Sequence, residues 1–339
     1  MTLDPGTTAL VAELAAEAQR LEQDGVTRAD VQRLAGAGLL AAYGPAELGG
    51  LPDDAQRELA EQLAGASPDA WFVWFQHGPV VRMLGRSGNA ALVERHLADL
   101  CAGRTQGGVA YSHLRTARPS VFAEQVAGGW RFTGTQPWCT GWPLVDLVLA
   151  GALDREGDRV VFALVPAGDR PELHSTGELA LAAMGGTGTH GLAFEGLSVP
   201  DEAVLLTWDR AEFAAYDTAL NANVQPSTYG IALAALDLLE QRAPGAAARL
   251  RPRVLDSRAQ AYRLLDEVPG EEQLDRRLAV RAQALVLAVE CCTALLAARG
   301  GQGMGLADPA QRLLRAAAFQ LVHSQAAHVR AATLDALTA

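Results

Sequence analysis

The chain has 339 residues, of which 49% are hydrophobic and 20% are charged, and its formal net charge at pH 7 is −11. This is the composition of a globular protein with room for two or three domains, and the acidic balance argues against nucleic-acid partners and against docking on a membrane. Four cysteines without a Cys-x-x-Cys pair, no signal peptide and no bilayer-length apolar run predict a cytoplasmic, soluble protein without disulfides and without a metal site.

A helical periodicity extends from about residue 8 to residue 104. Apolar residues recur at helical spacing from Leu10 to Leu21, and the pattern resumes after a capping signal at Thr27. A turn rich in glycine and proline at 44–51 is followed by helices expected over 53–63, 69–84 and 89–100, the second of them unusually aromatic. We therefore assign residues 1–105 to an N-terminal helical domain.

The hydrophobic period falls to two after residue 106. Two glycines separate the runs 122–126 and 130–133, and the charged turn 154–158 separates the runs 145–153 and 160–165, so each pair predicts a β-hairpin. Another strand is expected over 192–199, where Pro200 ends it. Residues 106–205 are thus predicted to form a central antiparallel β-domain.

Helical periodicity returns after Asp209. Long amphipathic segments are expected over 211–239, 253–266, 274–299 and 309–337. Four such helices predict a bundle in residues 206–339. The expected fold class is therefore α+β and multidomain, with an N-terminal helical domain, a central antiparallel β-domain and a C-terminal four-helix bundle.

Three glycine-containing strings carry the candidate chemistry. In GWRFTGTQPWCTG (129–141) a strand enters a turn at Gly134 and emerges with Trp138 and Thr140 pointing the same way, where an aromatic plane and a hydroxyl can hold a flat heteroaromatic ligand; a core tryptophan on a hairpin is the alternative. MGGTGTHGLAFEGLSVP (184–200) predicts a loop that binds phosphate or forms a plain turn. GGQGMG (300–305) predicts close approach of the main chain to a ligand or a helix cap.

Histidines offer further candidates at His77, His113 and His323, although a single histidine is more often structural. His323 and His328 are five residues apart, which is not a metal-ligand spacing on a helix. The patterns HxxxH, HExxH and GxSxG do not occur, which argues against a metallohydrolase or an α/β-hydrolase.

The order of these strings resembles that of the acyl-CoA dehydrogenase superfamily over nearly the whole chain. AGAGLLAAYGPAELGG (35–50) and GGQGMGLADPAQRLLRAAAF (300–319) extend the resemblance to both ends. The family binds FAD between the β-domain and the C-terminal bundle and forms homodimers or homotetramers. The resemblance therefore implies a homo-oligomeric flavoprotein with FAD as its cofactor.

Position by position, the resemblance implies two groups of site residues. The cofactor-binding group is Tyr111 and Ser112 beside the pyrimidine edge, Trp138, Cys139 and Thr140 along the flavin ring, and Gly300, Gly301 and Gly303 near the adenosine. The substrate pocket is expected to include His77, His113, Ser120 and Asn223.

The chain departs from the family at the catalytic base. Dehydrogenation needs a carboxylate base, and the family's glutamate positions correspond here to Ser324 and Asn223. The neighbouring His323 is the expected substitute, because an imidazole can accept a proton near neutral pH. We therefore predict His323 and Ser324 as the catalytic residues, in the last helix and about 100 degrees apart around it.

Two further segments differ from the family pattern. The run 113–120, HLRTARPS, replaces the loop that holds an acyl thioester, and Arg242-Ala-Pro-Gly replaces the segment that reaches a neighbouring FAD. Three functions remain open. The first is an FAD-dependent oxidoreductase of acyl-CoA dehydrogenase type, acting on an acyl thioester or a related small molecule with a non-standard base. The second is a monooxygenase using reduced FMN or FAD as co-substrate, and the third is a catalytically silent scaffold.

Overall fold

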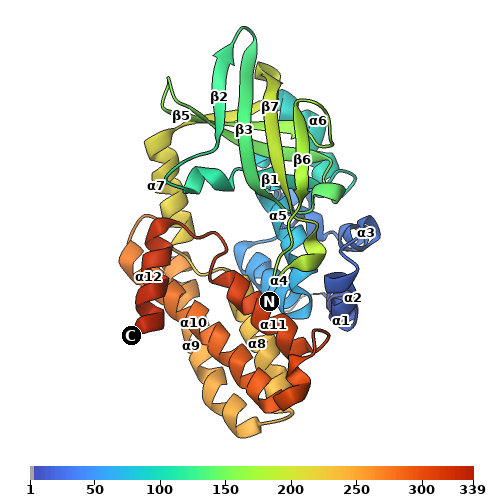
Figure 1. Ribbon diagram of the computed structural model, residues 1–339, viewed down its shortest axis with the longest axis vertical. Helices are drawn as coiled ribbons and strands as arrows, with labels where there is room; N and C mark the ends of the chain where they lie inside the picture. Colours follow the sequence, from blue (N-terminus) through green and yellow to red (C-terminus); the bar gives the residue numbers. More distant parts are fainter. Residues whose placement is uncertain (1–3) are drawn as a thin grey trace.

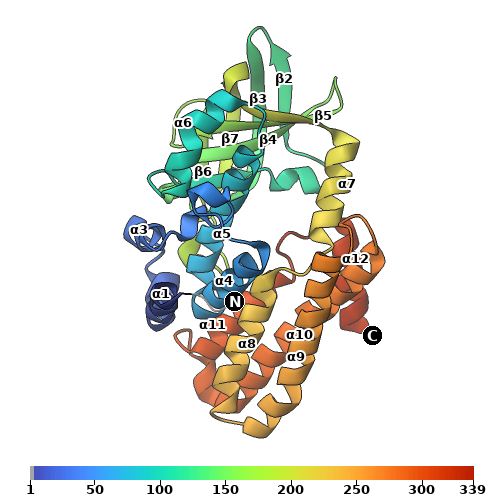
Figure 2. The same ribbon diagram turned by 180° about the vertical axis from the view of Figure 1, so that it is seen from behind.

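The computed structural model describes residues 4–339 and divides them into N-terminal helices, a β-sheet and C-terminal helices (Figure 1). The sheet forms one end of the molecule and the C-terminal helices form the other. Seen from behind, the N-terminal helices lie alongside both parts (Figure 2). This is the fold class that the sequence predicts.

The N-terminal part follows the predicted helices closely. It contains α1 (Pro5–Ala16), α2 (Ala18–Gln23), α3 (Arg28–Gly36), α4 (Asp53–Ala66), α5 (Pro68–Gly85) and α6 (Ala90–Cys101). Thr27 and Asp30 form a capping box at the start of α3, as the capping signal predicted. The helix expected over 10–21 is interrupted at Glu17, which separates α1 from α2.

The sheet is mostly antiparallel and contains both predicted hairpins. Its strands are β1 (Gly107–Ala110), β2 (Val121–Val126), β3 (Gly129–Cys139), β4 (Leu147–Asp154), β5 (Arg159–Pro166), β6 (Leu173–Glu178), β7 (His190–Pro200) and β8 (Val204–Asp209). The order is β6-β7-β3-β2-β4-β5-β8, with β1 beside β4, and the pairs β1–β4 and β2–β4 are parallel. Strands β1, β6 and β8 were not predicted, and β8 extends the sheet beyond residue 205.

The C-terminal part differs from the prediction because two expected helices are each divided. Its helices are α7 (Arg210–Asn221), α8 (Pro226–Glu240), α9 (Pro244–Glu267), α10 (Leu274–Arg299), α11 (Pro309–Gln320) and α12 (Ala327–Thr338). Pro226 is the first residue of α8, and a proline disfavours helix in the residue before it. The α11–α12 turn lacks proline and glycine. There Ser324 adopts a φ of 51°, and Arg281 donates a hydrogen bond to the carbonyl of His323.

Helix α10 is the central helix of the bundle and contacts α8, α9, α11 and α12. Together with the turn that follows it, α10 is long and apolar enough by length and composition to cross a membrane, but 56% of that apolar window is buried inside the protein. Its apolar surface is therefore accounted for by packing within the bundle.

The N-terminal helices and the bundle share one hydrophobic core. Helices α4 and α8 approach so closely that a Cβ on Gly230 would lie 2.0 Å from the carbonyl oxygen of Glu61. The buried Glu61 carboxylate also accepts hydrogen bonds from Arg258 and Tyr262 of α9. These contacts join the two helical parts into one body, and the sheet faces that body across a cavity.

Candidate active site

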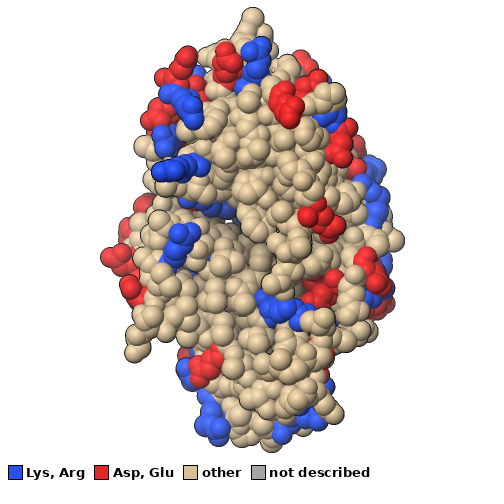
Figure 3. Space-filling view, in the orientation of Figure 1, with Lys and Arg blue, Asp and Glu red and all other residues tan. Residues whose placement is uncertain are grey.

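A cavity of about 790 Å³ lies between the sheet and the helical body. Its wall is formed by α4, α5, the turn η3 (Ser112–Arg115), the end of β3, α7, the start of α8 and the α11–α12 turn. The hollow is visible between the sheet and the bundle, and basic side chains border it (Figure 3). Its size is that of a small-molecule or cofactor site.

The end of β3 provides the aromatic and hydroxyl side chains that the sequence predicted. Trp138 and Thr140 both line the cavity, and Trp138 is 48% exposed, an unusual state for such a large apolar side chain. Cys139 lies between them on the opposite side of the strand, in the sheet's own core, where burial raises the pKa of its thiol to about 12. The Cys139 side chain therefore does not face the predicted ligand.

A chain of threonine hydroxyls fixes Thr140 and the glycine-rich loop. Thr187 bonds to Thr189 at 2.8 Å, and Thr189 donates to Thr140 at 3.0 Å. In the same loop the amide of Gly186 donates to the buried Asp69 carboxylate, and a Cβ on Gly186 would lie 1.8 Å from the carbonyl oxygen of Leu21. The loop therefore packs tightly against α2 and α5, and the plain-turn interpretation accounts for its glycines.

Turn η3 brings Tyr111 and Ser112 to the cavity, as predicted. The Ser112 hydroxyl accepts a hydrogen bond from the Gln136 amide at 2.8 Å. His113 also lines the cavity, but its Nδ1 accepts from the Ser120 amide at 3.1 Å and its Nε2 bonds to the Gly151 carbonyl at 2.8 Å. Ser120 lies outside the cavity wall and donates its hydroxyl to the carbonyl of Thr135. Of these residues, Tyr111 and Ser112 fit the predicted roles best.

His77 is not a pocket residue. Its ring is buried, Nδ1 accepts from the Gly107 amide at 2.9 Å, and Nε2 bonds to the Leu100 carbonyl at 3.2 Å. Burial lowers the pKa of His77 to about 4. Both nitrogens are occupied by the main chain, so His77 ties α5 to α6 and to the start of β1.

His323 reaches the cavity but lies in the turn after α11, which corrects its predicted position within a helix. Its ring contacts the rings of Trp71, Phe72, Phe75 and Phe319. Burial, reinforced by the nearby guanidinium groups of Arg281 and Arg115, lowers the pKa of His323 to about 3. The imidazole is therefore neutral at physiological pH and a weak proton acceptor.

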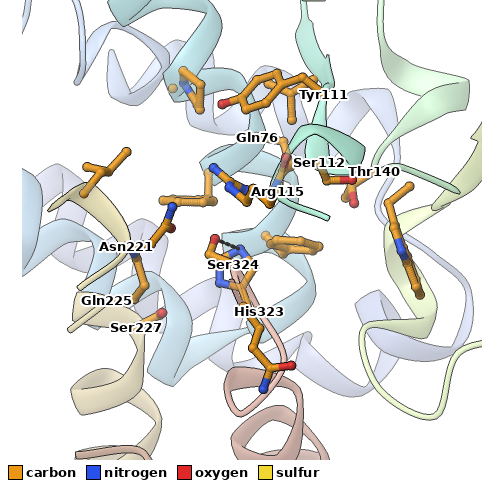
Figure 4. A pocket seen from close by; sticks show the side chains of 18 of the residues that line it. Gln76, Tyr111, Ser112, Arg115, Thr140, Asn221, Gln225, Ser227, His323 and Ser324 are labelled. Carbon is orange, nitrogen blue, oxygen red and sulfur yellow. Dashed lines mark hydrogen bonds between the residues drawn. The ribbon is translucent and has the colours of Figure 1, made fainter. Parts of the chain in front are cut away.

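Ser324 and Asn223 also line the cavity, at the two positions where a carboxylate base was sought. The Ser324 hydroxyl lies 3.4 Å from Nε2 of His323 (Figure 4). The Asn223 amide donates to the Ala219 carbonyl at 2.8 Å, and its oxygen accepts from Arg277 at 2.5 Å. Both polar atoms of the Asn223 side chain are thus already hydrogen-bonded within the protein, where they stabilise the α7–α8 connection.

The glycines predicted near the adenosine lie outside this cavity. Gly300, Gly301 and Gly303 form the turn η7 (Gly300–Met304) between α10 and α11. Gly300 has a φ of 59°, and a Cβ on Gly303 would lie 2.8 Å from the Leu296 side chain, so both have local structural reasons to be glycine. Arg242 lies between α8 and α9, also outside the cavity. Within one chain, these segments do not meet the ring-side residues.

Sequence reasoning missed an ion pair in the cavity wall. Nε of Arg115 in η3 donates to both carboxylate oxygens of Asp217 in α7, at 2.9 and 3.1 Å. The fully buried Arg281 donates to the carbonyls of Asn221 and His323 nearby. The sequence signal for this ion pair was Arg115 itself, three residues after Ser112 in the divergent run 113–120. Its partner Asp217 is 102 residues away in sequence, so the pair could not be predicted.

Sequence comparison identifies the N-terminal helices. Residues 7–104 match the family model described as acyl-CoA dehydrogenase, N-terminal domain. The chain is 27% identical to a mitochondrial 2-methylacyl-CoA dehydrogenase of Solanum tuberosum over 48% of this chain and 40% of that protein. It is 28% identical to a mitochondrial isovaleryl-CoA dehydrogenase of the japonica subspecies of Oryza sativa over 43% and 37%. The matches thus span about two fifths of the length of these relatives.

Fold comparison extends the similarity to the whole chain. Butyryl-CoA dehydrogenase from Megasphaera elsdenii superposes with a TM-score of 0.81 at 16% identity, covering 100% of both chains. The FAD complex of PigA superposes with a TM-score of 0.80 at 15% identity, covering 100% of this chain and 99% of that one. The family model thus matches the N-terminal helices, and the whole chain shares the acyl-CoA dehydrogenase fold, with its parts in the order that the sequence predicted.

Proposed function

We propose that this protein is a flavin-dependent oxidoreductase of acyl-CoA dehydrogenase type that uses FAD and acts on a small molecule in the cavity between the sheet and the bundle. The observation that carries the proposal is the exposed Trp138 beside the Thr140 hydroxyl at the cavity wall. A flat aromatic surface next to a hydrogen-bonding group fits a flavin ring. The fold shared with a protein solved as an FAD complex supports the same assignment.

The residues present fit the ring end of FAD. Trp138 provides a stacking surface, and Thr140, which accepts a hydrogen bond from Thr189, can donate its own proton to a polar edge of the ring. The buried Gln136 amide donates to the Ser112 hydroxyl and holds it at the cavity wall, where the hydroxyl can donate its own proton to a polar edge of the ring. Bound FAD would supply two-electron oxidation of the substrate.

The aromatic side of the cavity holds the substrate and excludes water. Trp71, Phe72, Phe75 and Phe319 form this wall around His323. A wall of this kind can position an apolar substrate body against the ring-side residues. The Ser324 hydroxyl, beside the Nε2 atom of the neutral His323, can exchange a hydrogen bond with the substrate.

Neither carboxylate of the cavity is placed to act as a base, and this favours a second candidate, a monooxygenase that uses reduced flavin as co-substrate. Of the two that line the described cavity, Asp53 is exposed at the start of α4 and Asp217 is paired with Arg115. His323 is too weakly basic to remove an α-proton efficiently at neutral pH. A reaction that needs no protein carboxylate is therefore the second candidate for this site.

The first experiment is a visible absorption titration of the purified protein with FAD. Trp138→Ala should weaken flavin binding about tenfold or more through loss of ring stacking, and Trp138→Phe should retain most of it. Thr140→Val should weaken binding, whereas Thr133→Val, an exposed position of the same strand, should not. Unchanged affinity in Trp138→Ala would remove the ring-stacking assignment.

The reaction is then distinguished by two assays. Anaerobic bleaching of bound FAD by butyryl-CoA would support the dehydrogenase reaction. Weak binding of oxidised flavin, with oxygen consumption from added reduced flavin that depends on His323, would support the monooxygenase. Binding of flavin in neither oxidation state would leave the catalytically silent scaffold.

A further inference from the structure

Arg115 lines the cavity, and its two terminal amino groups are not bonded to Asp217. Its Nε is held by the Asp217 carboxylate, which fixes the plane of the guanidinium. The guanidinium also interacts with Tyr111. Among the described residues, the well-formed bonds to a carboxylate come from Nε and not from the two terminal amino groups. Figure 4 shows the Arg115 side chain inside the pocket, between Tyr111 on one side and His323 and Ser324 on the other. A guanidinium held in this way offers a planar pair of N–H donors.

The surroundings of Arg115 carry an excess of positive charge. The Arg115 and Asp217 side chains are only 16% and 8% exposed, so solvent screens them little. Arg281 is fully buried nearby and hydrogen-bonds main-chain carbonyls in place of a carboxylate. Arg82 lies over the ring of Tyr43, and its charge also acts on Tyr111. One carboxylate, that of Asp217, therefore balances the guanidinium groups of both Arg115 and Arg281, an arrangement that an added anion stabilises.

The rest of the neighbourhood is apolar. The aromatic wall around His323, formed by Trp71, Phe72, Phe75 and Phe319, adjoins the cationic group. A ligand that satisfies both regions has an apolar body and one anionic group. A carboxylate matches the planar geometry of the two terminal amino groups, because it can accept both N–H bonds at once.

We propose that the substrate carries a carboxylate, and that Arg115 binds this group through its two terminal amino nitrogens while Asp217 holds the guanidinium in place. The proposal rests on the proposed function, because it assigns the substrate class of the same cavity. Arg115 follows the ring-side residues Tyr111 and Ser112, so the anion it binds belongs to the substrate and not to the phosphates of the flavin. Arg115 is the binding residue, and Asp217 is a positioning residue.

The test measures binding of hexanoate and of its uncharged analogue hexanamide by calorimetry, with FAD present and absent. Hexanoate should bind more tightly than hexanamide. Arg115→Gln should weaken hexanoate binding about 10- to 100-fold and leave hexanamide binding unchanged, because a charge-assisted pair is lost. Arg118→Gln, an exposed arginine of the same loop that lies outside the cavity, is the matched control and should change neither affinity.

Substitution of Asp217 tests whether hexanoate affinity changes in the predicted direction. Asp217→Asn keeps a side-chain oxygen that can accept from Nε of Arg115 and removes the negative charge that competes for the guanidinium, so it should tighten hexanoate binding about tenfold. The double variant Arg115→Gln/Asp217→Asn removes both charges of the ion pair together, so it should fold if Arg115→Gln alone does not, and it should bind hexanoate no better than hexanamide. A purely structural ion pair would instead lose affinity for both ligands in both single variants.

Three results would overturn the proposal. The first is equal affinity of the wild type for hexanoate and hexanamide. The second is inorganic phosphate binding as tightly as hexanoate. The third is Arg115→Gln weakening FMN binding while riboflavin binding is unchanged, which would assign Arg115 to the flavin phosphate. Since flavin affinity is measured separately from carboxylate affinity, loss of one proposal does not remove the other.

Discussion

Two buried histidines should make the stability of this protein depend on pH in a way that substitution can isolate. Burial lowers the pKa of His323 to about 3 and that of His77 to about 4. In the unfolded chain both return to about 6.5, so between these values the unfolded state binds more protons. Stability contributed by the neutral rings is therefore fully present above pH 6.5 and is lost as the pH falls toward 3 or 4.

The size of the effect follows from these pKa values. At pH 5 the unfolded imidazole is almost fully protonated while the folded one is almost fully neutral, which corresponds to about 2 kcal/mol lost per histidine relative to pH 7.5. The buried Asp69 acts in the opposite direction, because burial raises the pKa of its carboxyl to about 7 and acidification protonates it in the folded state. In the wild type, the stability lost by the histidines on acidification is thus partly offset by the stability gained through Asp69. The histidine contribution must therefore be measured in a variant.

The assay is urea unfolding at pH 7.5 and at pH 5, followed by tryptophan fluorescence and far-UV circular dichroism. His323→Phe keeps an aromatic ring among Trp71, Phe72 and Phe319 and removes the titrating group. Acidification should cost this variant about 2 kcal/mol less than it costs the wild type. Phe319→Leu alters the same cluster without a titrating group and should lower stability equally at both pH values. If His323→Phe and the wild type lose the same stability on acidification, the low pKa of His323 is wrong.

Three further substitutions test the packing that shapes the cavity, each by urea unfolding. Gly230→Ala places a Cβ 2.0 Å from the Glu61 carbonyl oxygen and should destabilise the protein by about 2 kcal/mol or more. The control Gly36→Ala has open space at its Cβ and should be neutral or stabilising. Equal effects of the two substitutions would refute the close crossing of α4 and α8. Arg277→Lys replaces a guanidinium that serves four carbonyls and the Asn223 side chain, and a loss of less than about 1 kcal/mol would contradict that role. Ser324→Gly should gain up to about 1 kcal/mol, because Ser324 has a φ of 51°, and a clear loss of stability would refute that conformation.

Local sequence signals predicted the elements that local chemistry determines. The capping box at Thr27, the two glycine- or charge-marked hairpins and the helix over 274–299 are all present. Trp138 and Thr140 were predicted to point the same way, and both line the cavity. The turn predicted at Gly134 was wrong, because β3 continues through it from Gly129 to Cys139. Each of the confirmed features depends on residues only a few positions apart, so the sequence pattern was sufficient.

The features that sequence reasoning missed depend on contacts between distant residues. The α7–α8 division carried a signal at Pro226 that was not used, but the α11–α12 division has no proline or glycine and coincides with a hydrogen bond from Arg281, 42 residues earlier in the chain. His77 and His113 were expected in the pocket, yet their nitrogens are occupied by main-chain groups up to 38 residues away. Nothing in a single sequence distinguishes a histidine that bonds a distant carbonyl from one that faces a ligand.

The division of the last predicted helix and the serine in place of a carboxylate at position 324 belong to one charge arrangement. Ser324 stands where the family's base was sought, but in a turn and not on a helix, so a helical angle between it and His323 does not apply. Arg281 bonds the carbonyl beside it, and together with Arg115 it lowers the pKa of the His323 imidazole. A carboxylate introduced here would be held as an anion by the same guanidinium groups, and its pKa would fall, which would make it a poorer base. The charges that make a protein base ineffective at this position are those that a carboxylate on the substrate would neutralise.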